Sequence, residues 1–280
     1  MAVKLIIDSG CDLNAQQAEA LGLILVPMTV HFGSEEFRSG VNLSSHAFYE
    51  KLAESQELPT TSQPTPYDFE TAYREVLDAG DEAVVLCVSS NLSGTYQSAC
   101  IAADGMEDRI HVVDTQSVTI GQRVLTDYAI SLRDQGLSAK EIAQKLEEKK
   151  ADVVVFGAVE TLEYLIKGGR LSKAAGAVGT VLGIRPVLTV KDGVLVMAGK
   201  ARGPKASLNM LKGFLEEAAI DTSLPCVAGY TGNDPEILKP LLEVCEPLLN
   251  GGHFPTTHIG STIGTHAGPG LVGIACFRKV

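Results

Sequence analysis

The sequence predicts an α/β fold of two packed α/β domains, the N-terminal one with a mostly parallel sheet and the C-terminal one with a mixed sheet. In the first half, short β-branched runs alternate with capped helices, which is typical of parallel strands joined by helical crossovers. From about residue 152 this rhythm changes, and Asp192-Gly193 between two apolar runs indicates a tight hairpin. The 280 residues, 45% of them hydrophobic, can bury cores of this size.

We expect the domain boundary after residue 157, dividing the chain into 1–157 and 158–280. No Pro/Ser/Gly-rich linker marks this boundary, so the two domains should pack closely. The cleft between or beneath them is the expected place for a ligand.

The first half predicts five or so parallel strands, and apolar strand-like runs cover 4–8, 23–32, 83–88 and 110–114. Capping chemistry places helices at about 14–22, 45–55, 65–80, 95–103, 117–135 and 138–150. Asn14 precedes Gln17 by three residues, and Ser138 precedes Glu141 likewise, as in capping boxes. Thr65 precedes a proline at a first helical position.

The second half predicts strands and helices that alternate less regularly. Strand-like runs cover 153–160, 186–190, 194–201, 225–230, 254–260 and 271–277. Helices are expected in the small-residue-rich segment 161–184, at about 204–219 and at 235–249. Mixed or antiparallel pairing is expected for these strands.

The charge balance and the cysteines limit the possible partners and compartments. With 23 basic and 34 acidic residues the formal charge is −11, so nucleic acid is an unsuitable partner and membrane contact is at most transient. The six cysteines form no Cys-x-x-Cys pair, which favours a reducing compartment. The start resembles no signal peptide and no apolar stretch reaches spanning length, so we expect a cytoplasmic protein.

Metal and nucleotide motifs are missing from the sequence. The six histidines show no pair at i, i+4 and no acidic second shell, so no metal is expected. The segment around Arg170 lacks P-loop spacing, and the glycines of the segment 174–184 do not follow a first strand as a dinucleotide fingerprint would. We therefore expect no cofactor.

Three polar clusters interrupt the apolar pattern, at 60–66, 89–95 and 264–270. Ser93 precedes a helix whose free N–H groups favour a carboxylate or phosphate, although a plain helix cap is an alternative. Thr61 and Ser62 are also compatible with ordinary turn chemistry. His266 stands among glycine, alanine and proline residues, and such a loop offers an imidazole little to pack on.

A serine hydrolase acting on acyl esters, with Ser93 and His266, is an alternative function. The nucleophile-elbow pattern Gly-x-Ser-x-Gly is absent, because Ser93 stands in Asn-Leu-Ser-Gly-Thr. A triad is defined by geometry, so the alternative stays open at this point.

The chain resembles the DegV family, specifically the fatty-acid-binding proteins of the bacterial fatty acid kinase system. The resemblance spans nearly the whole chain and rests on IIDSGCDL, PTTSQPTP, SSNLSGTYQSA, VVDTQSVTIGQ, ETLEYLIKGGRLS, GIRPVLTVKDG and GTHAGPG. One departure is Cys11, where the family more often carries a small hydroxyl residue or alanine. The order and spacing of these segments make the resemblance specific.

The resemblance implies a carrier that binds a long-chain fatty acid in an apolar tunnel and presents its carboxyl group to a partner kinase. The kinase would supply ATP and form the acyl phosphate, which an acyltransferase of phospholipid synthesis would then use. The carrier itself would not be an enzyme. The residues implied at the carboxyl group are Thr61 or Ser62, Ser93 and His266, with Thr265 as neighbour. Arg170 and Arg202 are implied near the pocket mouth, where they would serve the kinase or the acyl phosphate.

In such a site the polar end would determine the orientation of the ligand, and the apolar part would supply most of the affinity. Hydroxyl and imidazole donors would orient the carboxylate through charge-assisted hydrogen bonds. The tail would supply most of the affinity, since each buried methylene contributes about 0.8 kcal/mol, an upper bound on the order of 12 kcal/mol for sixteen carbons. Met28, Met197 and the small residues of 174–184 are candidates for a flexible apolar lining.

Overall fold

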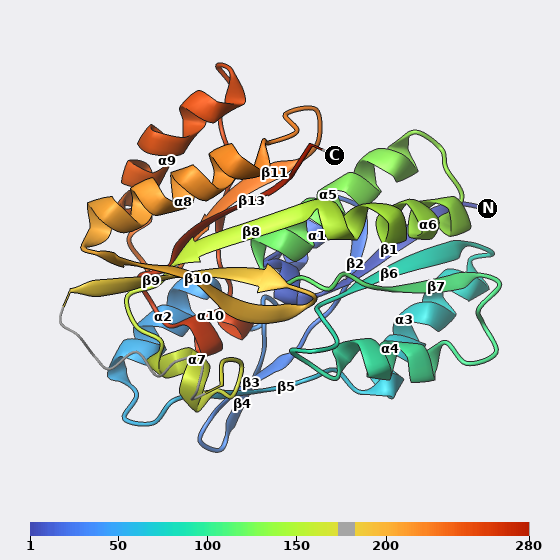
Figure 1. Cartoon of the computed structure of the whole chain (residues 1–280). Helices are drawn as coiled ribbons and strands as arrows, with labels where there is room; N and C mark the ends of the chain where they lie inside the picture. Colours follow the sequence, from blue (N-terminus) through green and yellow to red (C-terminus); the bar gives the residue numbers. More distant parts are fainter. Residues whose placement is uncertain (173–182, 280) are drawn as a thin grey trace.

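A computed structural model describes residues 1–172 and 183–279 and contains two larger sheets and one small sheet, with helices between and around them (Figure 1). The expected fold class is confirmed, because the N-terminal sheet is parallel and the C-terminal sheet is mixed. The expected boundary at residue 157 falls inside a strand of the C-terminal sheet, and the division into domains stays a prediction.

The N-terminal sheet has four strands, in the order β2-β1-β6-β7, rather than the five or so expected. Their bounds are β1 (Val3–Asp8), β2 (Leu23–Val26), β6 (Glu82–Cys87) and β7 (Ile110–Asp114). The run 23–32 divides at Pro27, which has no N–H for a sheet hydrogen bond, and its second half joins another sheet. Every residue of β6 is buried, as expected of a parallel strand with both faces covered.

A small antiparallel sheet of three strands was not expected. It consists, in spatial order, of β4 (Glu35–Arg38), β3 (Thr29–Phe32) and β5 (Thr60–Ser62). Strand β5 lies in a polar segment that reads as a loop, because three residues are too few for a periodic pattern. Pairing with β3 creates it, and Val30 stands opposite Thr61.

The C-terminal sheet has six strands in the order β10-β9-β8-β13-β11-β12. Their bounds are β8 (Val153–Ala158), β9 (Ile184–Lys191), β10 (Val194–Arg202), β11 (Cys226–Tyr230), β12 (Thr256–His258) and β13 (Val272–Phe277). The predicted hairpin between β9 and β10 is confirmed, and both turn residues have positive φ, 51° at Asp192 and 76° at Gly193.

The helices cover the sheets and fill the space between them (Figure 1). Helices α3 and α4 pack on one face of the parallel sheet, while α5 packs between its other face and the six-stranded sheet. Helices α8 and α9 cover the far face of the six-stranded sheet. The bounds are α1 (Ala15–Ala20), α2 (Ser45–Glu54), α3 (Pro66–Asp78), α4 (Thr95–Ala102), α5 (Ile120–Asp134), α6 (Ala139–Lys149), α7 (Glu163–Lys167), α8 (Pro204–Ala218), α9 (Lys239–Cys245) and α10 (Ser261–Ala267).

Local capping was predicted correctly where it depends on neighbouring residues. The Asn14 and Ser138 capping boxes form, and Thr65 accepts the Asp68 N–H at the start of α3. The expected single helix 235–249 is wrong: a short 3₁₀ turn precedes α9 and another follows it. Pro240 and Pro247 lie at the starts of successive pieces, because proline lacks the N–H that a helix interior needs.

The expected loop at 264–270 is partly wrong, because helix α10 extends through Ala267. Gly264 allows this helix to pack closely, since a Cβ there would collide with the rings of Phe48 and Tyr49. The small-residue-rich segment 161–184 contains the short helix α7, and the expectation for 173–182 lies outside the described residues.

Candidate ligand-binding site

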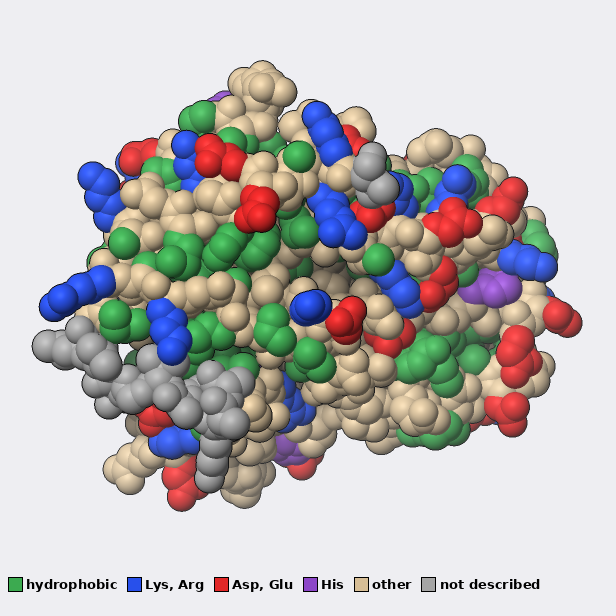
Figure 2. Space-filling model, viewed as in Figure 1, with side chains coloured by type: hydrophobic (Ala, Val, Ile, Leu, Met, Phe, Trp, Pro, Cys, Tyr) green, Lys and Arg blue, Asp and Glu red, His purple; other side chains and the backbone are tan. Residues whose placement is uncertain are grey.

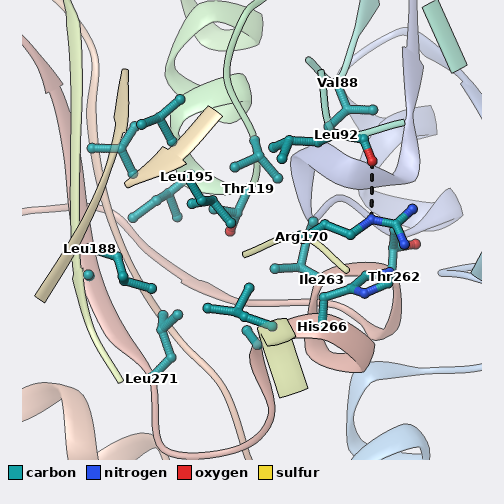
Figure 3. Close-up of a pocket in the computed structure, with 18 of the residues that line it drawn as sticks. Val88, Leu92, Thr119, Arg170, Leu188, Leu195, Thr262, Ile263, His266 and Leu271 are labelled. Carbon is teal, nitrogen blue, oxygen red and sulfur yellow. Dashed lines mark hydrogen bonds between the residues drawn. The ribbon is translucent and has the colours of Figure 1, made fainter. Parts of the chain in front are cut away.

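An apolar cavity lies where the loop after β6, the start of α5, the six-stranded sheet and α10 meet (Figure 3). Its empty volume is about 890 Å³, counting the open space at its mouth. Most of its wall is hydrocarbon, contributed by Met28, Val88, Leu92, Val118, Ile120, Val155, Phe156, Leu165, Leu188, Val190, Leu195, Ile263 and Leu271.

The polar end of the cavity is organised around Thr61 and His266. Strand β5 presents the Thr61 hydroxyl, and Oγ1 lies 2.8 Å from Nε2 of His266 on α10. The other imidazole nitrogen, Nδ1, is buried and has no hydrogen-bond partner among the described residues. The backbone of Gly168 closes over this ring, since a Cβ there would collide with Nδ1. A buried nitrogen without a partner is uncommon in proteins.

Burial and the nearby Arg170 guanidinium lower the pKa of His266 to about 4. The imidazole is therefore neutral at pH 7, so that one ring nitrogen carries a proton and the other does not. A ligand that brings negative charge to the ring would favour the protonated form.

Arg170 supplies a cation at the same end of the cavity. Its Nε donates to the Leu92 carbonyl at 3.2 Å (Figure 3). Its Nη1 donates to the Gly168 carbonyl at 2.7 Å, so the guanidinium is held by two backbone oxygens. Burial lowers its pKa, and no carboxylate among the described residues pairs with it. A half-buried cation without a counter-ion attracts an anion to this end of the cavity.

Ser93 lies in the cavity wall, after β6 and before α4. Its hydroxyl oxygen lies 2.8 Å from Oγ1 of Thr95 and accepts the Thr95 N–H at 3.3 Å. The N-cap of α4 is Gly94, which makes no side-chain cap. The Ser93 hydroxyl is thus oriented by Thr95 and not by His266.

Four of the residues expected at the site lie together, and three do not line the cavity. Thr61, Ser93, Arg170 and His266 line it. Ser62 faces the other side of β5, where its Oγ lies 2.8 Å from Nε2 of His31. Thr265 is buried and donates to the Ser261 carbonyl, and Arg202 is exposed at the end of β10. Of the two methionines expected in the lining, Met28 lies in the cavity wall. Met197 packs behind the wall, against the cluster that contains Leu165 and Leu188.

Two buried carboxylates, those of Asp8 and Asp12, connect segments that form the cavity wall, and the sequence did not assign them to the site. Asp8 accepts the Gly10 and Val88 N–H groups, each at 2.7 Å. Asp12 accepts the Thr119 hydroxyl at 2.6 Å and the Gly260 N–H at 2.9 Å, which joins the start of α5 to the start of α10. Burial raises the pKa of Asp8 to about 6 and that of Asp12 to about 7. The signal in the sequence is an acid at the end of the apolar run 5–7, with a second acid four residues further on.

The surface and the remaining side chains give three further observations. On the face seen in Figure 2, Lys and Arg side chains are interspersed with Asp and Glu. Within 1–172 and 183–279, His, Cys, Asp and Glu form no group that could hold a metal ion. No helix in this part of the chain is both long and apolar enough to cross a membrane.

The fold and the cavity together define an α/β protein with two larger sheets and one small sheet, whose apolar cavity ends in a polar, cationic cluster. A family model described as "Uncharacterised protein, DegV family" matches residues 2–279. The chain belongs to the DegV family.

Solved structures with the same fold include proteins described as binding fatty acids. A DegV family protein from Thermus thermophilus, described by its fatty acid binding, is 33% identical with a TM-score of 0.88 and full coverage of both chains. DegV from Bacillus subtilis, described as a fatty acid binding protein, is 31% identical with a TM-score of 0.85, over 99% of this chain and 100% of that one. The Streptococcus pneumoniae fatty acid kinase B3 protein loaded with linoleic acid is 23% identical, with a TM-score of 0.86 and full coverage of both chains, a likeness of fold.

Proposed function

We propose that this protein binds one long-chain fatty acid, with the carboxylate at Thr61, Ser93, Arg170 and His266 and the tail in the apolar cavity. The observation that carries the proposal is the Arg170 cation, which lies without a carboxylate partner among the described residues, at one end of a hydrocarbon-lined space. An amphipathic anion satisfies both features at once. The fatty acids described for the relatives from Thermus thermophilus and Bacillus subtilis support this ligand class.

The head group would be held mainly by charge-assisted hydrogen bonds. The imidazole can donate to Thr61 while Thr61 donates to a carboxylate, Ser93 can donate as well, and Arg170 adds its charge in a partly desolvated place. Removal of one such bond costs about 1.5 to 3 kcal/mol. These bonds fix the orientation of the carboxyl group at the cavity end, while burial of the tail supplies most of the affinity.

We further propose that the protein is a cytoplasmic carrier and not an enzyme, and that a partner kinase phosphorylates the carboxyl group of the bound acid with ATP. An acyltransferase would then use the acyl phosphate for phospholipid synthesis. This part of the proposal rests on the resemblance of the sequence to the fatty acid kinase system. The exposed residues Ser62 and Arg202, which lie outside the cavity, are left as candidates for contact with the partner, and the buried Thr265 is left as a candidate for support of α10.

Mass spectrometry of gently purified protein tests the central proposal. We expect one co-purifying fatty acid per chain, and delipidated protein should bind long-chain fatty acids in a titration. A delipidated protein that folds but rejects every fatty acid would overturn the proposal. Acyl phosphate formation would be measured separately, with a candidate kinase and ATP added to the loaded carrier.

The serine hydrolase alternative receives no support from the geometry of the site. The Ser93 hydroxyl is paired with Thr95, and His266 Nε2 is paired with Thr61. Within the described residues no carboxylate orients Nδ1 of His266, as a triad would require. We expect that a fluorophosphonate probe leaves Ser93 unlabelled, and labelling of this serine would return the hydrolase to consideration.

A further inference from the structure

One glycine in the cavity wall, Gly157, has no evident structural reason to be a glycine. It lies in β8, an interior strand of the six-stranded sheet, where its neighbours across the strands are Leu188 and Gly273. The φ angle of Gly157 is not positive, so the backbone conformation does not require glycine. Glycine in the interior of a strand lowers the stability of the fold. The glycine at position 157 is therefore unfavourable for folding.

Two glycines in register with Gly157 are explained by packing. A Cβ at Gly273 would lie 2.9 Å from the Phe156 carbonyl oxygen, and a Cβ at Gly229 would lie 2.7 Å from the Ile120 side chain. Neither position can accept a methyl group without movement of its surroundings. At Gly157, by contrast, the nearest described atoms would be 3.8 Å away, in Leu271 and the Val272 carbonyl. A methyl group fits there without strain.

The space above Gly157 belongs to the cavity. Residues two apart on a strand face the same side, so Gly157 shares its face with Val155, and both line the cavity. Leu188 and Leu271, the neighbours of Gly157, lie on the side of the cavity away from Arg170 and His266 (Figure 3). Gly157 is therefore at the end where the tail of a bound acid would lie.

We propose that Gly157 is a specificity-determining residue for acyl chain length. Its missing side chain keeps open the space that takes the distal methylenes of a long chain, and a larger residue would restrict the site to shorter acids. The inference rests on the proposed fatty acid binding.

The test compares Gly157→Ala and Gly157→Leu with the native protein in titrations with decanoate, myristate and palmitate. Each methylene that loses its place weakens binding about four-fold, so palmitate should lose affinity in the alanine variant and lose more in the leucine variant. Decanoate should bind as before. The melting temperature of the alanine variant should be unchanged or higher, because alanine replaces glycine within a strand.

Gly213→Ala is the matched control, since Gly213 is exposed on α8 and has open space around it. It adds the same methyl group and should leave all three affinities unchanged. If the leucine variant does not fold, the alanine variant still tests the proposal, because a methyl group fits the native space. The role of Gly157 would be overturned if a folded variant bound all three acids as tightly as the native protein, or lost the same affinity for each of them. Failure of the native protein to bind any of the acids would instead overturn the proposed function.

Discussion

Nε2 of His266 lies 2.8 Å from Oγ1 of Thr61, although the two residues are 205 positions apart in the chain. Thr61 is placed by the pairing of β5 with β3, and His266 by the packing of α10 against the aromatic side chains of α2. The polar end of the cavity therefore exists only when both the small sheet and α10 are in place.

The two neighbouring hydroxyl residues of β5 should differ in their effect on binding. Thr61→Val keeps the shape of the side chain and removes the donor, so fatty acid affinity should fall by about 1.5 to 3 kcal/mol, or roughly ten- to a hundred-fold. Ser62→Ala is the control, because Ser62 faces His31 outside the cavity. Calorimetric titration with palmitate gives both values. An unchanged Thr61→Val affinity, or an equal loss in both variants, would remove Thr61 from the head-group site.

The Arg170 charge should matter for an anionic head group only. Arg170→Gln should weaken palmitate binding by about 1.5 to 3 kcal/mol, since a charge-assisted bond is lost, and should change hexadecanol binding much less. A variant that simply distorts the loop would weaken both ligands equally, which would contradict a direct contact with the carboxylate. Arg202→Gln, at an exposed residue outside the cavity, serves as the control and should bind both ligands normally.

Loading with a fatty acid should raise the pKa of His266. In the free protein burial and Arg170 hold it at about 4, and a carboxylate beside the ring stabilises the imidazolium form. Because the complex then binds a proton more tightly than the free protein, affinity should increase as the pH falls from neutral, until the ligand carboxyl itself protonates. NMR titration of the imidazole C–H signal, assigned with His266→Gln, measures the shift. Identical titration of the free and loaded protein would place the carboxyl group elsewhere.

Asp12 should make stability decrease as the pH rises. Its folded-state pKa is about 7, above the ordinary value of 3.8, so the folded protein holds this proton more tightly than the unfolded chain. Its contribution is complete below about pH 4 and is lost as the pH rises to about 7, at a rate of at most about 1.4 kcal/mol per pH unit. Asp12→Asn removes this titration.

Urea unfolding at several pH values between four and eight measures the effect of Asp12. The free energy of unfolding of Asp12→Asn, relative to the native protein, should rise with pH across this window. The exposed Asp104→Asn serves as the control and should run parallel to the native protein. A parallel course for Asp12→Asn as well would mean that Asp12 titrates alike in the folded and unfolded states.

Features that depend on neighbouring residues could be predicted from the sequence. The capping boxes at Asn14 and Ser138, the hairpin turn at Asp192-Gly193 and the buried strand β6 all follow from short-range hydrogen bonding, turn geometry or apolar composition. The resemblance of the motifs to the DegV family also directed attention to Thr61, Ser93, Arg170 and His266, which the structure places around one cavity.

Long-range pairing and close packing decided what the sequence left open. Strand β5 is too short to carry a pattern, and pairing with β3 determines that Thr61, and not Ser62, faces His266. The glycines of 264–270 read as a loop, and helix α10 extends into this segment because Gly264 allows close contact with aromatic rings. The sequence by itself determined the strands of the two larger sheets, the caps and the residue types of the site. Only the tertiary structure decided which side chains share the cavity, because contacts between distant segments leave no periodic signal in the chain.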